Sequence, residues 1–180
     1  MIKLFRIILY FIVFIYSLII FLPKENLFFY IINQLENEKI FLNYTKSEDK
    51  FLKFRLDNIE IEYDDIKIAQ ISKIKIENYF FYNQITIKNI ISDNSLQTFI
   101  PRTISNIKVI YSILDPLDIN IKIDSRLANA IGTIDIINKK LSLVLNISKK
   151  FQKRYPMIIK NLKFKEKTNK GGKYSYEYNF

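Results

Sequence analysis

The chain has 180 residues, of which 49% are hydrophobic, with no Cys, no His and a formal net charge of +10. Without Cys the chain has no disulfides, thiol nucleophiles or Cys-ligated metal sites, and without His it lacks the commonest general base and metal ligand. We therefore expect a non-enzymatic protein with no catalytic residues, no cofactor and no metal, built as one domain plus a membrane segment.

The positive charge is concentrated at the two ends of the chain. Residues 23–148 contain 16 basic and 16 acidic residues, whereas residues 149–180 contain 10 basic and 2 acidic residues. This distribution argues against a basic core that wraps nucleic acid, so we do not expect direct nucleic-acid binding as the main role. The three glycines, Gly132, Gly171 and Gly172, are too few for a glycine-rich phosphate loop.

Residues 1–22 have the character of a transmembrane anchor. Residues 4–22 contain one charge, Arg6, and approach the roughly 20 apolar residues that cross a bilayer. Lys3 and Arg6 precede the apolar run, which predicts a cytoplasmic N-terminus and a C-terminal domain in the periplasm, on a single-pass inner-membrane protein. A cleavable signal peptide is the alternative, but no Ala or Gly lies near the exit. The predicted anchor residues are Ile7, Ile8, Leu9, Phe11, Ile12, Phe14, Ile15, Leu18, Ile19, Ile20 and Phe21.

Residues 23–39 have the spacing of an amphipathic helix that begins at Pro23. Their apolar stripe is expected to pack on the protein's own domain, with docking to another envelope protein as the alternative. The stripe consists of Leu27, Phe28, Ile31, Ile32 and Leu35.

From residue 40 the apolar period changes to two, which predicts β-strands. The apolar parity switches between Leu56 and Ile59, which indicates a bulge or bend at the intervening Asp-Asn pair. The pair Asp64-Asp65 predicts a turn, and an acidic catalytic or cation-binding pair is the less favoured interpretation. Closely spaced strands without intervening helices predict antiparallel pairing. We therefore expect residues 40–180 to form a mainly β domain: a curled antiparallel sheet, as an open sandwich or half-barrel, with one or two amphipathic helices.

A basic helix is expected near residues 151–162. Pro156 interrupts its apolar stripe and could mark the true helix start, and Phe164 could belong to a further strand. Such a helix either lies on an anionic membrane surface or caps the open end of a sheet. The candidate residues for contact with membrane or a partner are Lys150, Phe151, Lys153, Arg154, Tyr155, Lys160 and Lys163.

The final segment, residues 174–180, alternates aromatic and polar residues as "YSYEYNF". An outer-membrane β-barrel ends in this way, but it needs many strands of about 10 residues and no spanning helix. We interpret the segment as the last strand of the sheet, with its aromatic face on the core, and Gly171-Gly172 as the turn before it.

The order of these parts resembles the protein N component of type II secretion systems and the wider AsmA-like group. The resemblance is carried by "LPKENLFFYIINQL", "FLKFRLDNIEIEYDDIKIAQI", "GTIDIINKKLSLVLNIS" and "NKGGKYSYEYNF". It implies an inner-membrane anchor that carries a long, open, twisted sheet in the periplasm. Relatives of such machinery also serve DNA uptake in transformation.

Three functions follow as hypotheses. The first is a component of a type II secretion-like or transformation DNA-uptake machinery, which binds partner subunits through a sheet edge or the helix at residues 23–39. The alternative is a periplasmic carrier or bridge for lipid or lipopolysaccharide with an apolar β-groove, which would require an apolar face left uncovered. Salt-sensitive DNA binding by residues 149–173 ranks below both.

Overall fold

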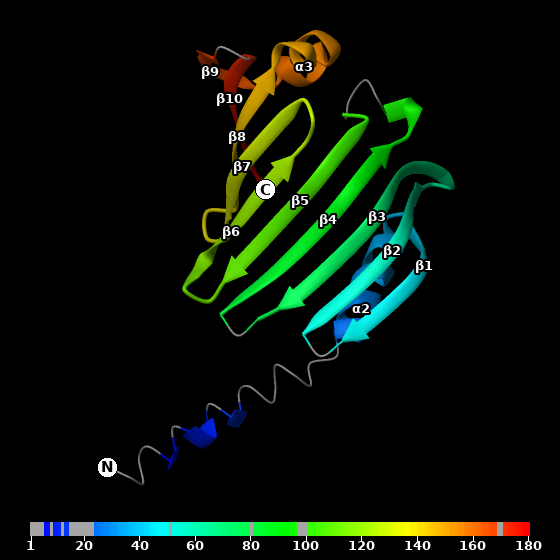
Figure 1. Ribbon diagram of the computed structural model, residues 1–180, viewed down its shortest axis with the longest axis vertical. Coiled ribbons are helices and arrows are strands. Elements are labelled where there is room, and N and C mark those ends of the chain that lie inside the picture. The colour runs from blue at the N-terminus through cyan, green and yellow to red at the C-terminus, as the bar shows by residue number, and fades with distance from the viewer. Residues whose placement is uncertain are drawn as a thin grey trace.

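The computed structural model is a single curled sheet with helices on one side of it (Figure 1). The structure describes residues 6–7, 9–11, 13–14, 24–50, 52–79, 81–96, 101–168 and 171–180. Its helices are α2 (Lys24–Asn37), the 3-10 turn η1 (Asn94–Leu96), α3 (Lys149–Arg154) and α4 (Pro156–Lys160). Its strands are β1 (Ile40–Lys50), β2 (Lys53–Tyr63), β3 (Ile66–Asn78), β4 (Tyr82–Ser92), β5 (Thr103–Ser112), β6 (Asp115–Asp124), β7 (Ala128–Asp135), β8 (Lys140–Ser148), β9 (Lys163–Thr168) and β10 (Gly171–Asn179).

The ten strands form one antiparallel sheet in the order β1-β2-β3-β4-β5-β6-β7-β8-β10-β9. From β1 to β8 each strand pairs with the next in sequence, so the sheet is a meander. After β8 the chain passes through α3 and α4, forms edge strand β9 and returns as β10 between β8 and β9. The prediction of a mainly β fold with an open antiparallel sheet is therefore confirmed.

Strands β2 and β4, on either side of β3, bend where their apolar parity changes. Asn58 in β2 and Asn89 in β4 have φ of 51° and 53°, a left-handed conformation that Asn tolerates better than most residues. On both sides of the bend the apolar residues belong to the same core cluster. The bend predicted from the sequence of β2 is thus present, and it keeps the apolar side chains of a long strand on one face.

Helix α2 covers the first strands of the sheet. Phe28 and Ile32, in its predicted apolar stripe, are buried against Phe54 and Ile59 of β2. The Phe28 ring lies 5.1 Å from that of Phe54, centroid to centroid. Burying each such side chain contributes roughly 1.5–3 kcal/mol, so the helix is held by its own domain. The side chains of Leu27 and Ile31 lie outside the described residues.

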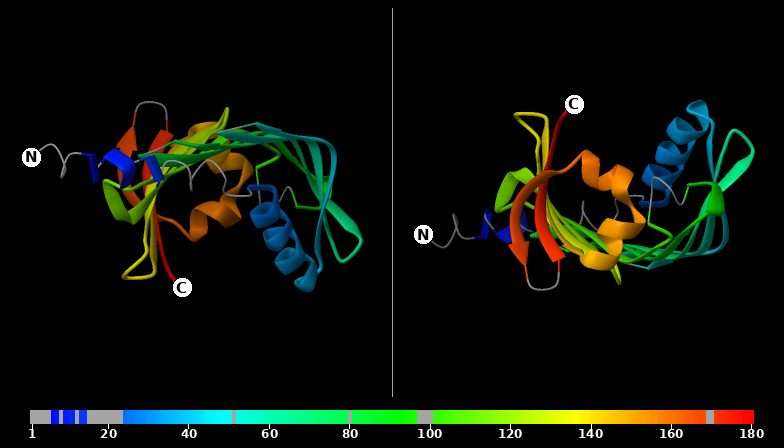
Figure 2. Two further views of the ribbon diagram at one scale, coloured as in Figure 1. Left: turned by 90° about the horizontal axis from the view of Figure 1, so that it is seen from below. Right: turned by 90° about the horizontal axis from the view of Figure 1, so that it is seen from above.

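Two short helices, rather than one, cover the other end of the sheet. The predicted stripe is interrupted at Tyr155, whose φ of −125° and ψ of 59° end α3, and Pro156 then begins α4. The Ser148 side chain accepts a hydrogen bond from the backbone N–H of Phe151 and caps α3. Phe151 and Tyr155 are buried with Ile147 and Tyr174 in a second core. Both helical covers lie on the same, concave side of the sheet (Figure 2).

The turn predictions had different outcomes. Asp64 and Asp65 form the predicted turn between β2 and β3, with φ of 50° and 63°. The prediction that Gly171-Gly172 is a turn is wrong, because both glycines lie inside β10. A Cβ at Gly171 would lie 1.8 Å from the Ile147 carbonyl oxygen, so this glycine permits close approach of two strands.

Most of the predicted anchor lies outside the described residues. The described parts, residues 6–7, 9–11 and 13–14, are helical, and their apolar side chains are exposed. Within the residues that the structure describes, no helix has the length and apolar character needed to cross a membrane. The predicted anchor residues for which nothing is described are Ile8, Ile12, Ile15, Leu18, Ile19, Ile20 and Phe21.

We predict that Gly132→Ala lowers the free energy of unfolding by about 1–3 kcal/mol, because an added Cβ would force backbone movement. That Cβ would lie 2.0 Å from the Ser142 carbonyl oxygen in the neighbouring strand. Urea unfolding in mild detergent, followed by circular dichroism, measures the change. Ser72→Ala at an exposed position of β3 is the control, and an equal effect of the two substitutions would contradict the prediction.

Candidate functional site: the concave face of the sheet

Apolar residues run across the whole concave face of the sheet. Residues that lie directly opposite each other on antiparallel strands share a face, so cross-strand pairs can be followed from one strand to the next. One such row is Leu56, Ile74, Ile87, Ile107, Ile123, Ala130, Leu145 and Tyr174. A parallel row is Phe54, Ile76, Ile85, Val109, Ile121, Gly132, Leu143 and Tyr176.

The burial of these rows is uneven. At the α2 end Phe54 and Leu56 are each 1% exposed, and at the other end Tyr174 is 8% exposed beside α3. Between them Ile107, Val109, Ile121 and Ile123 are only half-buried and belong to neither core cluster. An apolar stretch over β5 and β6 therefore lies between the two helical covers. The ribbons of both covers are seen on the concave side of the sheet in Figure 2. We call this stretch, defined by those four residues, the open apolar face.

A basic cleft of about 340 Å³ lies at one end of the same side of the sheet. Arg102, Arg126, Lys150 and Arg154 line it, and no carboxylate does so among the described residues. The Tyr155 hydroxyl accepts a hydrogen bond from the Arg102 backbone N–H at 3.2 Å and joins α3 to the start of β5. Four cations around one cleft favour an anionic group.

The predicted contact residues of the C-terminal region divide into two groups. Phe151 and Tyr155 are 3% and 2% exposed, so they hold α3 on the sheet and present no surface to a partner. The basic members are exposed, namely Lys150, Lys153, Arg154, Lys160 and Lys163. Of these, Lys150 and Arg154 line the basic cleft.

Sequence reasoning missed Arg102 and Arg126 as members of the basic cleft. Arg102 precedes β5 and Arg126 lies in the turn between β6 and β7, far in sequence from α3. No local pattern connects the three segments, so only the meander and the return of the chain over its concave side bring them together.

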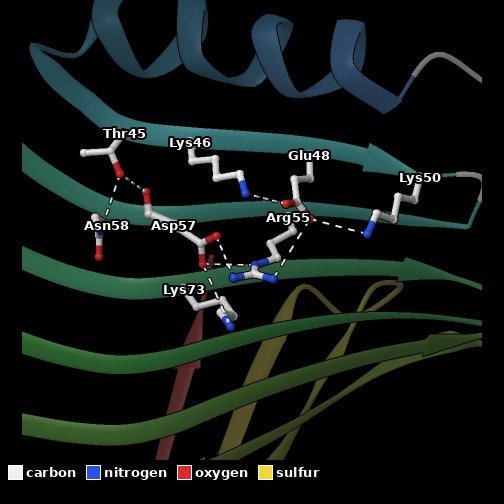
Figure 3. Close-up of polar contacts among 8 residues, drawn as sticks. All are labelled: Thr45, Lys46, Glu48, Lys50, Arg55, Asp57, Asn58 and Lys73. Carbon is white, nitrogen blue, oxygen red and sulfur yellow. Dashed lines mark hydrogen bonds and ion pairs between the residues drawn. The ribbon is translucent and has the colours of Figure 1, made fainter.

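The convex face of the first strands carries a ladder of ion pairs (Figure 3). Arg55 lies 2.8 Å from Asp57, and Lys46 lies 2.7 Å from Glu48. The hydrogen bond from Lys46 lowers the pKa of Glu48, and the hydrogen bond to Asp57 raises the pKa of Arg55. Oppositely charged pairs on a solvent-exposed sheet face stabilise cross-strand pairing modestly, and their charges favour contact of that face with water.

Glu77 is the most buried carboxylate described, at 6% exposed. Burial raises its pKa, but the hydrogen bonds from Lys75 and Tyr79 outweigh that effect and the net pKa is lowered. Lys75 lies 2.8 Å and Lys53 3.5 Å from the same carboxylate oxygen. Among the described residues no group of three or more acidic side chains is placed to hold a metal ion. Glu77 therefore has the surroundings of a structural ion pair.

No protein-family model matches the chain, and no curated protein or solved structure matches it either. The resemblance to type II secretion protein N and AsmA-like proteins consequently stays a prediction.

We predict that Glu77→Gln destabilises the fold at neutral pH by about 1–2 kcal/mol, through loss of charge-assisted hydrogen bonds at a buried position. Because folding lowers the pKa of Glu77, its contribution is present above the unfolded-state pKa and is lost as pH falls through the folded-state pKa. Unfolding curves measured between neutral and acidic pH should converge for wild type and variant at low pH. Glu36→Gln, at an exposed position of α2, is the control, and an unchanged gap at all pH values would refute the assignment.

Proposed function

We propose that the chain is a non-enzymatic, inner-membrane-anchored periplasmic protein that binds lipid on the concave side of its sheet. The observation that supports this proposal is the open apolar face between two helical covers. A contiguous apolar surface that the fold leaves partly exposed is typical of a ligand-binding or interaction site.

The dimensions and chemistry of the concave side suit a membrane lipid. Strands β5 and β6, of 10 residues each, extend about 34 Å, against about 15 Å for the acyl region of one leaflet. Each methylene moved from water onto the apolar face contributes about 0.8 kcal/mol, so one chain supplies substantial affinity. The basic cleft lies on the same side and would hold an anionic head group.

The N-terminal residues support placement at a membrane. Residues 4–22 are almost entirely apolar, and the described Ile7, Phe11 and Phe14 are 64%, 63% and 58% exposed. In this proposal the segment crosses the inner membrane once and the sheet lies in the periplasm, where it meets lipid that leaves the outer leaflet.

We predict that Ile121→Glu reduces lipid that co-purifies with the full-length protein by about fivefold or more, because a carboxylate on the open apolar face opposes acyl chains. The protein is purified in mild detergent from its native membranes, and bound lipid is quantified by mass spectrometry. Ile131→Glu is the matched control, since Ile131 is 60% exposed in β7 and, opposite Lys122 and Val144, lies on the convex face.

Circular dichroism establishes that both variants keep the sheet. Equal lipid content in wild type, I121E and I131E, or no lipid above the detergent background, would refute lipid binding on this face.

A second candidate function is a partner-binding subunit of a type II secretion-like or transformation DNA-uptake assembly. The observation that favours it is the open edge at β1, whose outer side pairs with no other described strand. The opposite edge, β9, carries Lys163, Lys165 and Lys167, and lysines discourage pairing with another strand. Strand addition would therefore take place at β1.

We predict that a photo-crosslinking residue at Asn43, exposed on β1, captures a secretion or uptake subunit in intact cells, and that the same residue at Lys165 on β9 does not. Deletion of the protein should also abolish secretion or transformation. Normal secretion and transformation after deletion, together with no machinery subunit crosslinked at Asn43, would remove this candidate.

A further inference from the structure

We infer that the hairpin turns at one end of the sheet insert into the surface of a lipid bilayer. Because neighbouring strands are antiparallel, the turns after β1, β3, β5 and β7 lie at the same end as the C-terminal end of β10. We call this end the tip row. Its exposed apolar side chains are Phe81, Tyr82, Ile113, Leu114, Leu117, Ile136, Ile137, Tyr178 and Phe180.

The composition of the tip row is unusual for hairpin turns. Turns are normally rich in Gly, Asn, Asp and Ser, yet Leu114 is 81% exposed and Ile137 is 65% exposed at two successive tips. The turns at the opposite end follow the usual pattern, with Asp64-Asp65 after β2 and Ser125-Arg126 after β6. Tyr63 and Ile66, which flank Asp64-Asp65, are also exposed at 50% and 61%, but the turn residues between them are acidic. Among the described hairpin turns, exposed apolar residues at the turn positions themselves therefore occur at the tip row.

Backbone hydrogen bonds fix the tips to one another. The Ile113 N–H donates to the Phe81 carbonyl at 3.0 Å, and the Ile136 N–H donates to the Leu117 carbonyl at 2.9 Å. In the same way the Phe180 N–H donates to the Lys139 carbonyl at 2.9 Å. The exposed apolar residues are thus held in a continuous line along the end of the sheet and cannot fold back as independent loops.

The path of the chain favours a bilayer as the surface that the tip row contacts. The Asp64 N–H donates to the Lys39 carbonyl, which places the end of α2 at the polar end of the sheet. Helix α2 runs back beside β1, and its Phe28 packs on Phe54 near the start of β2, so residue 24 lies toward the tip row (Figure 1). The apolar residues 4–22 precede that point in sequence, so a membrane that holds them would face the tips.

The surroundings of the tips suit the interfacial layer of a bilayer. Tyr79 and Tyr82 pack with ring centroids 4.7 Å apart beside Phe81, and aromatic side chains with a polar group prefer this layer. Lys139 follows the β7 tip, where a lysine can extend toward lipid phosphates, while the adjacent Lys140 forms an ion pair with Glu177 at 3.4 Å. Asp115 follows Leu114 directly, so insertion is limited to about the depth of a side chain. This inference does not depend on whether the open apolar face holds a lipid.

The chain contains no Trp, so a single introduced Trp reports on one position. The full-length L114W, M157W and F11W variants are reconstituted into phosphatidylethanolamine–phosphatidylglycerol vesicles with brominated acyl chains. M157W is the matched control, because Met157 is 56% exposed in α4 on the polar end, and F11W reports on the N-terminal segment. We expect bromine near the head-group end of the chain to reduce L114W fluorescence about twofold and to leave M157W unchanged.

If F11W is quenched but L114W is quenched no more than M157W, the inference about the tip row is overturned, while the N-terminal segment is still placed in the bilayer. Absence of quenching in both L114W and F11W, for protein that floats with the vesicles, would overturn it as well. Quenching of L114W that is strongest for bromine near the head group, and absent in M157W, supports insertion of the tip row.

Discussion

The structure depends on how a sheet only one layer thick buries its apolar face. A sandwich covers such a face with a second sheet, and a closed barrel covers it with its own far wall. This protein does neither among the residues described, and covers the concave face with α2 at one end and with α3 and α4 at the other. Two separate cores result, and the strands between them connect the cores by backbone pairing while their apolar side chains stay half-buried.

The two ends and the two faces of the sheet consequently differ in chemistry. The convex face of the first strands is held by ion pairs in water, and the concave face is apolar. One end carries acidic and basic turns with the basic cleft, and the other carries exposed Leu, Ile and aromatic residues. A molecule with this asymmetry has a preferred orientation at any boundary between water and an apolar phase.

Much of the sheet was predictable because alternation along a strand directly reflects which face is buried. The parity switch at Leu56 and Ile59 located the bend around Asn58, and Asp64-Asp65 located a turn. The stripe with Phe151 and Tyr155 was recognised, but its division into two helices depends on local geometry at Tyr155 that a helical spacing does not reveal. Glycine suits both turns and close strand contacts, so the sequence alone does not distinguish a turn at Gly171 from its place in β10, where the Ile147 carbonyl leaves no room for a Cβ.

Long-range features were harder to foresee from one sequence. The placement of β10 between β8 and β9 carries no local signal, and the basic cleft combines residues that precede β5, follow β6 and lie on α3. The apolar residues around Leu114 and Ile137 stand out in the sequence, but the alternation of apolar and polar residues does not determine which turns share an end of the sheet. The strand order places both turns in the tip row.

The meander has a consequence for how the chain acquires its structure. Since each strand from β1 to β8 pairs with its immediate neighbour in sequence, contacts are formed over short loops and the entropic cost of closing them is small. Helix α2 and β1–β3 contain all the buried residues of the first core, so the N-terminal part can form a nucleus onto which later hairpins add one after another. Such a chain is suited to vectorial folding as it emerges from a ribosome or a translocation channel. During folding, the last strand added exposes unpaired backbone N–H and C=O groups that can bind another strand. This exposure ends on that side when β10 pairs with β8 and β9, whose lysines discourage further strand addition, forms the edge.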